Sequence, residues 1–263
     1  GKLGHFCIHV SEGCRNCYAE RLQPFYGTGI ADGYQKWMLD EGLIEVFLDE
    51  KVLAGILRAR PRGPFKHGPR PKIFWEDMSD IFGEWVPFAW IDRCAAMVAL
   101  TPQYDHQWLT KRAKEMREYF NHPDGQNRIK TEAICLCVDN PRVDARTGND
   151  WIWPLPNLHL GVSVEDQQRA DKRIPDLLAT PAAVRFISAE PLLGAVDLTS
   201  IHWPNDLWPR KSEMDVIASA FVAQPNVGIP KLDWVIVGGE SGPGARPMHP
   251  AWARTKPDQS QAV

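Results

Sequence analysis

Three cysteines stand close together near the start of the sequence and could hold a metal ion or an iron–sulfur cluster. Cys7, Cys14 and Cys17 follow the spacing C-x6-C-x2-C. Two thiolates separated by two residues can point at one metal from a tight turn, and Gly13 allows the backbone to fold there. In a reducing compartment such a group of cysteines indicates metal binding or redox chemistry rather than disulfide bonds.

The number of cysteines leaves three interpretations open. A structural zinc ion usually takes four protein ligands, and His5 or His9 could provide the fourth. A four-iron cluster held by three cysteines leaves one iron open to an exogenous ligand, and the odd ligand count favours this reactive arrangement. The third interpretation is a group of buried cysteines without a ligand.

The other three cysteines are expected to be small core residues. Cys135 and Cys137 form a C-x-C pair on an apolar segment, and two ligands are too few for a metal site. Cys94 falls in an amphipathic helix pattern. We therefore place the chemistry at the first three cysteines.

Further candidates follow short apolar runs, at the points where predicted strands end. Carboxylates there could hold ribose hydroxyls or an amino group, and lysine or arginine could hold a carboxylate or phosphate. These candidates are Ser79, Asp80, Lys111, Ser163, Glu165, Asp166, Ser188, Glu190 and Arg246. Glu190 stands out because Pro191 ends regular structure directly after it. Glu165 and Asp166 precede a predicted helix and could equally be helix-cap residues.

A glycine-rich segment follows the last predicted strand. Gly238, Gly239 and Glu240 begin this segment, and two more glycines follow within four residues. Without side chains, the backbone amides could approach a ligand closely, so we include these three residues among the cofactor-binding candidates. A simple glycine-rich turn is the alternative.

The candidates require a scaffold that brings several strand ends together. Short β-branched or aromatic runs lie at residues 6–10, 72–76, 106–109, 158–162, 184–187 and 234–237. Helical periodicity follows at residues 18–22, 88–100, 113–120 and 167–178. Strands that alternate with helices predict a parallel sheet, here a full or partial TIM-like βα barrel with its function at the carboxyl ends of the strands. A doubly wound sheet is the alternative.

We expect one domain over residues 1–263, with decorations. Three irregular stretches, residues 27–70, 121–157 and 199–232, interrupt the βα pattern as insertions. Trp151 and Trp153 in the second, and Trp203 and Trp208 in the third, could line a substrate pocket or a partner-protein interface. Residues 254–263 form a polar tail that cannot bury a helical face, so the last βα unit should lack its closing helix.

The composition limits the function classes. The 263 residues are 44% hydrophobic and 24% charged, as in ordinary globular proteins, and the net charge of −3 excludes nucleic-acid binding by bulk electrostatics alone. The one strong basic run, residues 58–72, could contact nucleic acid or be a solvated face. No run of about 18 apolar residues and no signal-peptide pattern occurs, so we expect a cytoplasmic protein without membrane contact.

Six motifs spread over nearly the whole chain resemble the phage-associated three-cysteine-motif family of unknown function. They lie at residues 13–20 (GCRNCYAE), 78–82 (MSDIF), 109–112 (LTKR), 160–166 (LGVSVED), 188–194 (SAEPLLG) and 234–247 (WVIVGGESGPGARP). That family is similar in pattern to radical S-adenosylmethionine enzymes. The resemblance implies a [4Fe-4S] cluster and a barrel of βα units, although C-x6-C-x2-C departs from the commoner C-x3-C-x2-C spacing of those enzymes.

The resemblance also implies roles for particular residues. The three cysteines would hold three irons, S-adenosylmethionine would chelate the fourth, and Tyr18 resembles the aromatic residue that contacts adenine. A Gly-Gly-Glu signature that binds the methionine amino group normally follows the second strand. Here the similar tripeptide follows the sixth strand, so Ser79 and Asp80 take the expected place.

The function expected from the sequence is an iron–sulfur, S-adenosylmethionine-dependent radical enzyme of phage or bacterial type, with its substrate open. One alternative is a zinc-stabilised, nucleic-acid-associated binding protein. Another is an inactive copy, because relatives of the resembled family continue past residue 249 with a helix and a strand, which suggests C-terminal truncation or a frameshift here. A partner protein could then supply the missing surface.

Overall fold

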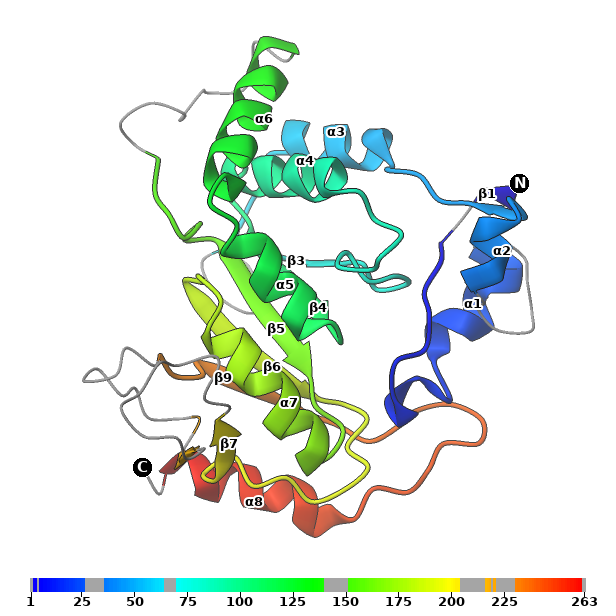
Figure 1. Cartoon of the computed structure of the whole chain (residues 1–263), viewed down its shortest axis with the longest axis vertical. Helices are drawn as coiled ribbons and strands as arrows, with labels where there is room; N and C mark the ends of the chain where they lie inside the picture. Colours follow the sequence, from blue (N-terminus) through cyan, green and yellow to red (C-terminus); the bar gives the residue numbers. More distant parts are fainter. Residues whose placement is uncertain are drawn as a thin grey trace.

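A five-stranded parallel sheet, in the order β3-β4-β5-β6-β9, positions the rest of the chain (Figure 1). The computed structural model describes residues 2–3, 5–26, 36–63, 70–139, 151–203, 216–218, 220 and 230–261. The strands are β3 (Lys72–Trp75), β4 (Asp105–Thr110), β5 (Leu158–Ser163), β6 (Val184–Ala189) and β9 (Trp234–Val237). Each coincides with a predicted run, which confirms a mixed α/β protein with a parallel sheet.

Helices connect the strands, as parallel pairing requires. The predicted helices are present as α1 (Tyr18–Tyr26), α4 (Phe88–Ala99), α5 (Ala113–Phe120) and α7 (Gln167–Leu178). Figure 1 shows α5 and α7 side by side on one face of the sheet. Residues 27–70 include α2 (Lys36–Asp40), α3 (Glu50–Arg58) and β2 (Ile44–Glu45), which pairs with β1 (Lys2–Leu3). Residues 199–232 include the antiparallel pair β7 (Ile201–Trp203) and β8 (Val216–Ala218).

The register gives the sheet two chemically different faces. Residues that pair across neighbouring strands point to the same side of a sheet. One face carries the row Leu109, Gly161, Phe186 and Trp234 and, nearer the carboxyl edge, the row Ser163, Ser188 and Ile236. The other face carries Trp108, Leu160, Val162 and Ile187, which are at most 1% exposed and share a core with the buried sides of α4, α5 and α7. The polar ends of the first face are therefore available for a site.

Gly161 is required by the packing of the first face. A Cβ atom at this position would lie 2.4 Å from the ring of Phe186, which is fully buried and stacks on Trp234 with ring centroids 4.6 Å apart. We expect Gly161→Ala to lower the free energy of unfolding by about 1–3 kcal/mol because the ring cannot withdraw. Urea denaturation measures this, with Gly55→Ala in α3 as the comparison, which should not destabilise because a Cβ there meets nothing within 4 Å and alanine favours a helix more than glycine does. Equal midpoints for Gly161→Ala and the unaltered protein would contradict the packing argument.

The prediction of a strand at residues 6–10 was wrong, because this segment has no regular secondary structure. Its carbonyl groups are occupied by side chains instead of a strand partner. Ser79 Oγ donates to the carbonyl oxygen of Phe6 at 2.6 Å, and Arg112 Nη2 donates to that of Ile8 at 3.1 Å. A strand exists only with a neighbour that satisfies its backbone groups, and the apolar alternation of this segment did not reveal that none was present.

The second predicted irregular stretch contains a helix, α6 (Gly125–Asp139), which is a correction. Ile129, Ala133 and Leu136 are at most 4% exposed and lie in the core, and α6 packs on α4. Their spacing is helical, but the exposed apolar residues Ile134 and Val138 blur the periodicity. Cys135 is displaced from this stripe and is exposed, so the expectation that it is a core residue was also wrong.

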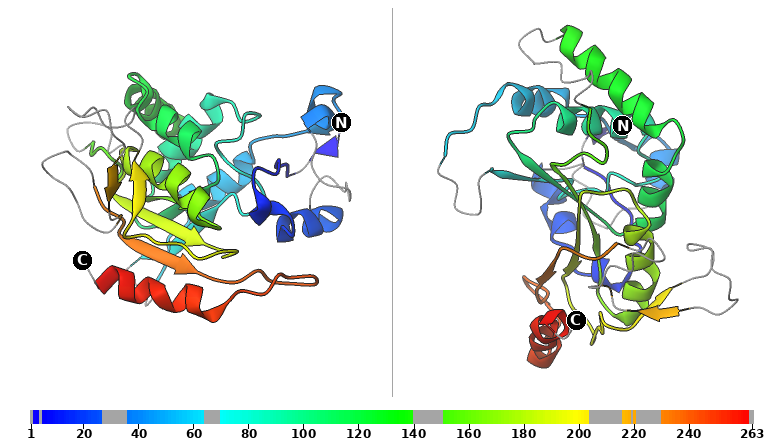
Figure 2. Two further views of the ribbon diagram at one scale, coloured as in Figure 1. Left: turned by 60° about the horizontal axis from the view of Figure 1, so that its bottom comes forward. Right: turned by 90° about the vertical axis from the view of Figure 1, so that its left-hand side faces the viewer.

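The expectation that the polar tail 254–263 leaves the last βα unit without a closing helix was wrong. The structure has α8 (Pro250–Gln261), which lies alongside β9 (Figure 2). Trp252 packs against the main core from the first turn of this helix. Tertiary packing supplies most of the stability of a helix in a protein, so the anchored first turn offsets the polar sequence that follows. Among the described residues, no helix is long and apolar enough to cross a membrane.

Candidate functional site

The segment from residue 5 to residue 17, called here the cysteine segment, crosses the carboxyl edge of the sheet. It contacts the residues after β3, β4, β5 and β9 in that order, which is also their order in the sheet. The contacting pairs are Phe6 with Ser79, Ile8 with Arg112, Ser11 with Glu165, Glu12 with Arg246, and Asn16 with Glu240. Strand ends far apart in the sequence therefore position the three cysteines together.

A cavity of about 450 Å³ lies between the cysteine segment and the strand ends. Cys7, Cys14 and Cys17 all line it, with Cys14 buried and the other two half-buried. The other predicted site residues that line it are Tyr18, Ser79, Asp80, Lys111, Ser163, Ser188, Glu190, Gly239 and Glu240. The structure thus brings most of the candidates to one place, because the carboxyl ends of parallel strands share one edge.

The three thiols share this cavity, but they are not arranged around a single point. Within the described ranges, no group of three histidine, cysteine or acidic side chains could hold a metal ion as placed. Burial raises the pKa of Cys7 to about 12, and the charges of Asp80, Cys14 and Cys17 act in the same direction. Thiolates are the ligands of iron–sulfur clusters, so the donor set fits a cluster in chemistry. Binding requires the three thiols to converge and to release their protons.

Neither histidine proposed as a zinc ligand joins the cysteines. Nε2 of His9 lies 3.2 Å from the carboxylate of Glu20, on α1. His5 lines a second cavity, which Cys7 does not line. A tetrahedral zinc site would therefore require a rearrangement of the segment before either ring could contribute.

Glu165 anchors the cysteine segment but does not line the cavity. Its carboxylate is 1% exposed and accepts from Arg173 Nη1 at 2.8 Å and Ser11 Oγ at 2.6 Å, with Lys111 Nζ at 3.4 Å. Burial alone would raise the pKa of Glu165, but Lys111 and Arg173 outweigh it and hold the pKa below its usual value. A Cβ at Gly13 would lie 2.4 Å from Glu165, so the glycine permits this close approach.

Glu240 and Arg246 anchor the other end of the segment. Glu240 accepts from Nε and Nη2 of Arg246 at 3.0 and 2.5 Å and from Asn16 Nδ2 at 2.8 Å. The hydrogen bonds from Arg246 lower the pKa of Glu240 to about 2. Arg246 Nη2 also donates to the carbonyl oxygen of Glu12 at 2.8 Å. The glycine-rich segment therefore positions the loop that carries Cys14 and Cys17.

Ser79 and Asp80 are also engaged by the protein. Ser79 holds Phe6, while Asp80 is 4% exposed and accepts from Thr110 Oγ1 at 2.7 Å and Arg112 Nη1 at 2.9 Å. Both residues thus position the cysteine segment at the ends of β3 and β4. Asp166 does not line the cavity and caps α7, accepting from the backbone N–H of Arg169 at 2.9 Å.

Tyr18 and Glu190 present their side chains at the exposed side of the cavity. The Tyr18 ring is half exposed, its hydroxyl donates to the carbonyl oxygen of Asp77 at 2.7 Å, and burial of that hydroxyl raises its pKa to about 12. Glu190 is exposed, and a Cβ at Gly238 would lie 2.6 Å from its carboxylate. Gly238 does not line the cavity, so its function here is to leave room for Glu190.

The sequence did not reveal Glu76, which directly follows β3. Its backbone φ is +57°, a conformation that side chains other than glycine rarely adopt. Burial raises the pKa of Glu76 to about 7, and the charges of Asp80 and Asp77 add to the effect. Strained backbone and a raised pKa are typical of functional positions, but neither can be read from residue type or spacing.

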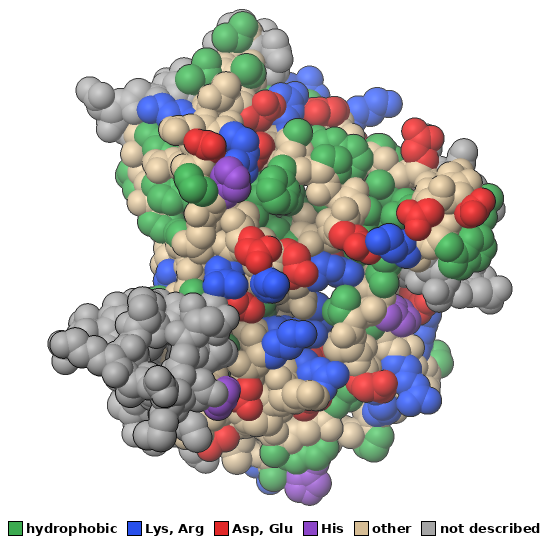
Figure 3. Space-filling view, viewed as in Figure 1, with side chains coloured by type: hydrophobic (Ala, Val, Ile, Leu, Met, Phe, Trp, Pro, Cys, Tyr) green, Lys and Arg blue, Asp and Glu red, His purple; other side chains and the backbone are tan. Residues whose placement is uncertain are grey.

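The remaining predicted features that the structure describes do not line the cavity. Arg70 and Lys72 of the basic run pair with Asp105 at 2.8 and 3.6 Å, and residues 64–69 fall outside the described ranges. Figure 3 shows acidic and basic side chains intermingled on one face of the described surface. Trp151 and Trp153 pack against the core. Trp208 and the side chain of Trp203 fall outside the described part of the chain.

The fold and the cavity define an α/β protein that carries a cysteine-lined site at the carboxyl edge of a five-stranded parallel sheet. The chain belongs to a family described as "Protein of unknown function (DUF5131)", which matches residues 4–263. No curated protein and no solved structure matches the sequence.

Proposed function

We propose that this protein is an iron–sulfur, S-adenosylmethionine-dependent radical enzyme of phage or bacterial type, with Cys7, Cys14 and Cys17 as the cluster ligands. The observation that supports it best is that all three cysteines line one cavity at the carboxyl edge of a parallel sheet. Three thiolates and an open edge suit a cluster that binds an exogenous ligand at its fourth iron. When bound, such a cluster would supply the electron that cleaves S-adenosylmethionine to methionine and a 5′-deoxyadenosyl radical.

The proposal includes a partial βα barrel. The strand face that carries Ser163, Ser188 and Ile236 turns toward the cavity, while α4, α5 and α7 share the core of the opposite face. The cysteine segment reaches from the end of β3 to the end of β9, which are the two edge strands. It would thus cover the mouth of a barrel that the strands leave open.

The chain's own residues would bind and orient the cofactor. The exposed ring of Tyr18 would stack on the adenine, and the carboxylate of Glu190 would hold an amino group or ribose hydroxyls by charge-assisted hydrogen bonds. Asp80, Glu165 and Glu240 would keep the cysteine segment in place, since each carboxylate is already saturated by the protein.

Cys14→Ala tests the proposal directly. After anaerobic reconstitution with iron and sulfide, the unaltered protein should show an iron-dependent visible band and release 5′-deoxyadenosine from S-adenosylmethionine under reducing conditions. Cys14→Ala should lower bound iron and this release by at least about tenfold, since two thiolates hold a cluster poorly. Cys135→Ala is the matched control, because that cysteine is exposed on α6 and does not line the cavity. It should leave both readouts unchanged.

Metal analysis of the same preparations decides between this proposal and the alternatives. One equivalent of zinc without iron, unaffected by attempts at reconstitution, would support a zinc-stabilised binding protein. Equal iron content in Cys14→Ala and Cys135→Ala would also overturn the proposal. A loaded cluster without any cleavage of S-adenosylmethionine would point to the inactive copy.

A further inference from the structure

A second cavity, of about 550 Å³, adjoins the cysteine-lined cavity. Phe74, Glu76, Asp77 and Ser79 line both cavities, so the end of β3 separates them. Its other walls come from the start of the cysteine segment, the loop before α3, α3, β3, the loop between β3 and α4, and α4. A molecule bound in the second cavity would therefore lie next to whatever occupies the first.

The walls of the second cavity combine aromatic rings with carboxylates. The aromatic residues that line it are Phe6, Phe47, Phe74, Trp75, Trp85 and Trp90. Its acidic residues are Asp49, Glu76 and Asp77, and no lysine or arginine occurs among the described residues that line it. Aromatic faces and carboxylates both attract a cation, and flat rings stack on aromatic side chains. This lining disfavours an anionic ligand.

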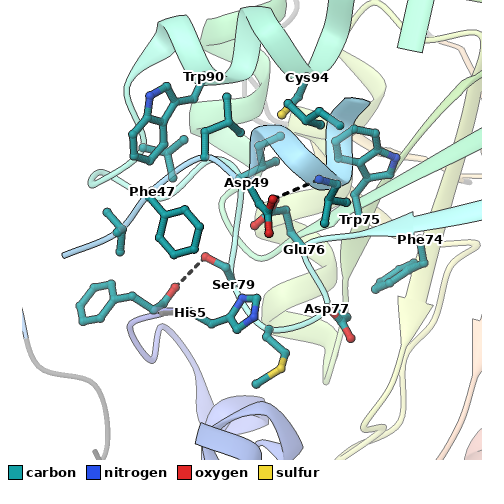
Figure 4. Close-up of a pocket in the computed structure, with 18 of the residues that line it drawn as sticks. His5, Phe47, Asp49, Phe74, Trp75, Glu76, Asp77, Ser79, Trp90 and Cys94 are labelled. Atoms are coloured by element: carbon teal, nitrogen blue, oxygen red, sulfur yellow. Dashed lines mark hydrogen bonds between the residues drawn. The ribbon is translucent and has the colours of Figure 1, made fainter. Parts of the chain in front are cut away.

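The structure leaves Glu76 as the acidic group best placed to meet a ligand. Asp49 accepts from the backbone N–H groups of Lys51 and Val52, both at 3.0 Å, and caps α3. Asp77 is exposed, and its carbonyl oxygen accepts from Tyr18. Figure 4 shows Glu76 among Asp49, Phe47 and Ser79. Glu76 lines both cavities. Its backbone φ of +57° is a strained conformation, and such conformations cluster at ligand-binding positions.

We infer that the second cavity binds an aromatic or heteroaromatic compound that carries a cationic or hydrogen-bond-donating nitrogen, with the ring against the aromatic wall and the nitrogen at Glu76. The assignment of this compound as the enzyme's substrate rests on the proposed function. The binding itself requires only the residues of this cavity.

The groups around Glu76 give the binding a pH dependence. Asp80, Asp77, Asp49, His5 and Cys94 are the titratable groups that line this region or act on Glu76. Burial and the first two carboxylates raise the pKa of Glu76 to about 7. Above that pH Glu76 is charged, so the affinity for an ammonium group should increase from pH 6 to pH 8.

Isothermal titration of the full chain with tryptamine and with indole-3-propionate tests the inference. The two probes share an indole ring but carry opposite charges. At pH 8 tryptamine should bind at least about tenfold more tightly than indole-3-propionate. Lowering the pH to 6 should weaken the binding of tryptamine severalfold. Phe47→Ala and Glu76→Gln should each lower the affinity for tryptamine at least about fivefold. Phe47 is half exposed, so its replacement should leave the fold intact, which circular dichroism checks.

Glu84→Gln is the matched control, because Glu84 is exposed, pairs with Lys36 and does not line the cavity. It should leave tryptamine binding unchanged. Equal affinities for the two probes, no binding of either at about 10 mM, or tryptamine binding that survives both cavity variants would overturn the inference. Cluster loading is measured separately through Cys14→Ala, so failure of the cluster and failure of this cavity give different results.

Discussion

Replacing Glu165 by glutamine is expected to lower the free energy of unfolding by about 3–5 kcal/mol. The substitution removes the charge that compensates Arg173, whose side chain is 6% exposed, and that also attracts Lys111. An unpaired buried guanidinium is far costlier than the pair, and the neutral amide cannot replace both ionic contacts. Urea denaturation at pH 7 measures the difference.

The pH dependence identifies the ionic origin of this effect. Because the pKa of Glu165 is held below its usual value, its contribution is complete above the unfolded-state pKa and is lost as the pH falls through the folded-state pKa. The deficit of Glu165→Gln should therefore shrink in acid. Glu118→Gln, which alters an exposed pair with Lys114, should cost less than about 0.5 kcal/mol. A deficit below about 1 kcal/mol for Glu165→Gln would contradict the structural role given to this carboxylate.

Glu76→Gln is expected to raise the stability at pH 8, by up to about 3 kcal/mol, and to have little effect near pH 4. The folded-state pKa of Glu76, about 7, lies above the ordinary 4.5, so the folded protein binds more protons than the unfolded chain between these values. The stability of the unaltered protein therefore falls as the pH rises through this window. Glutamine cannot ionise, so the variant escapes that loss.

Thermal or urea unfolding from pH 4 to pH 8 checks this prediction as a difference between the two proteins. Other groups contribute to both curves, including His106, whose pKa burial lowers to about 4, and they cancel in the difference. Glu84→Gln should run parallel to the unaltered protein, since Glu84 is exposed. Parallel curves for Glu76→Gln as well would show that this carboxylate is not destabilised by its position. If Glu76→Gln is more stable at pH 8 and also binds tryptamine more weakly, Glu76 lowers the stability of the protein while it contributes to binding.

The sequence predicted the elements that depend on local pattern. The five strands of the central sheet and the helices α4, α5 and α7 follow from short β-branched runs that alternate with helical periodicity. Since parallel strands end at a common edge, the polar residues after them were expected to meet, and most of them line the same cavity as Cys7, Cys14 and Cys17. The helix α6 was not predicted, because exposed apolar residues blur the helical spacing of Ile129, Ala133 and Leu136.

Only the tertiary structure decided the roles of individual residues within this site. Ser11 and Glu165 are 154 positions apart in the sequence, and Asn16 and Glu240 are 224 apart, so no local pattern could show that these carboxylates hold the cysteine segment. Ser79 and Arg112, also distant in the sequence, donate to carbonyl groups of residues 6–10, where a strand was predicted. The second cavity and the left-handed backbone of Glu76 likewise arise from packing between distant elements. Residue types and their periodicity thus determined which elements form and which edge they share, whereas long-range hydrogen bonds and burial determined which side chains face a ligand and which only hold the protein together.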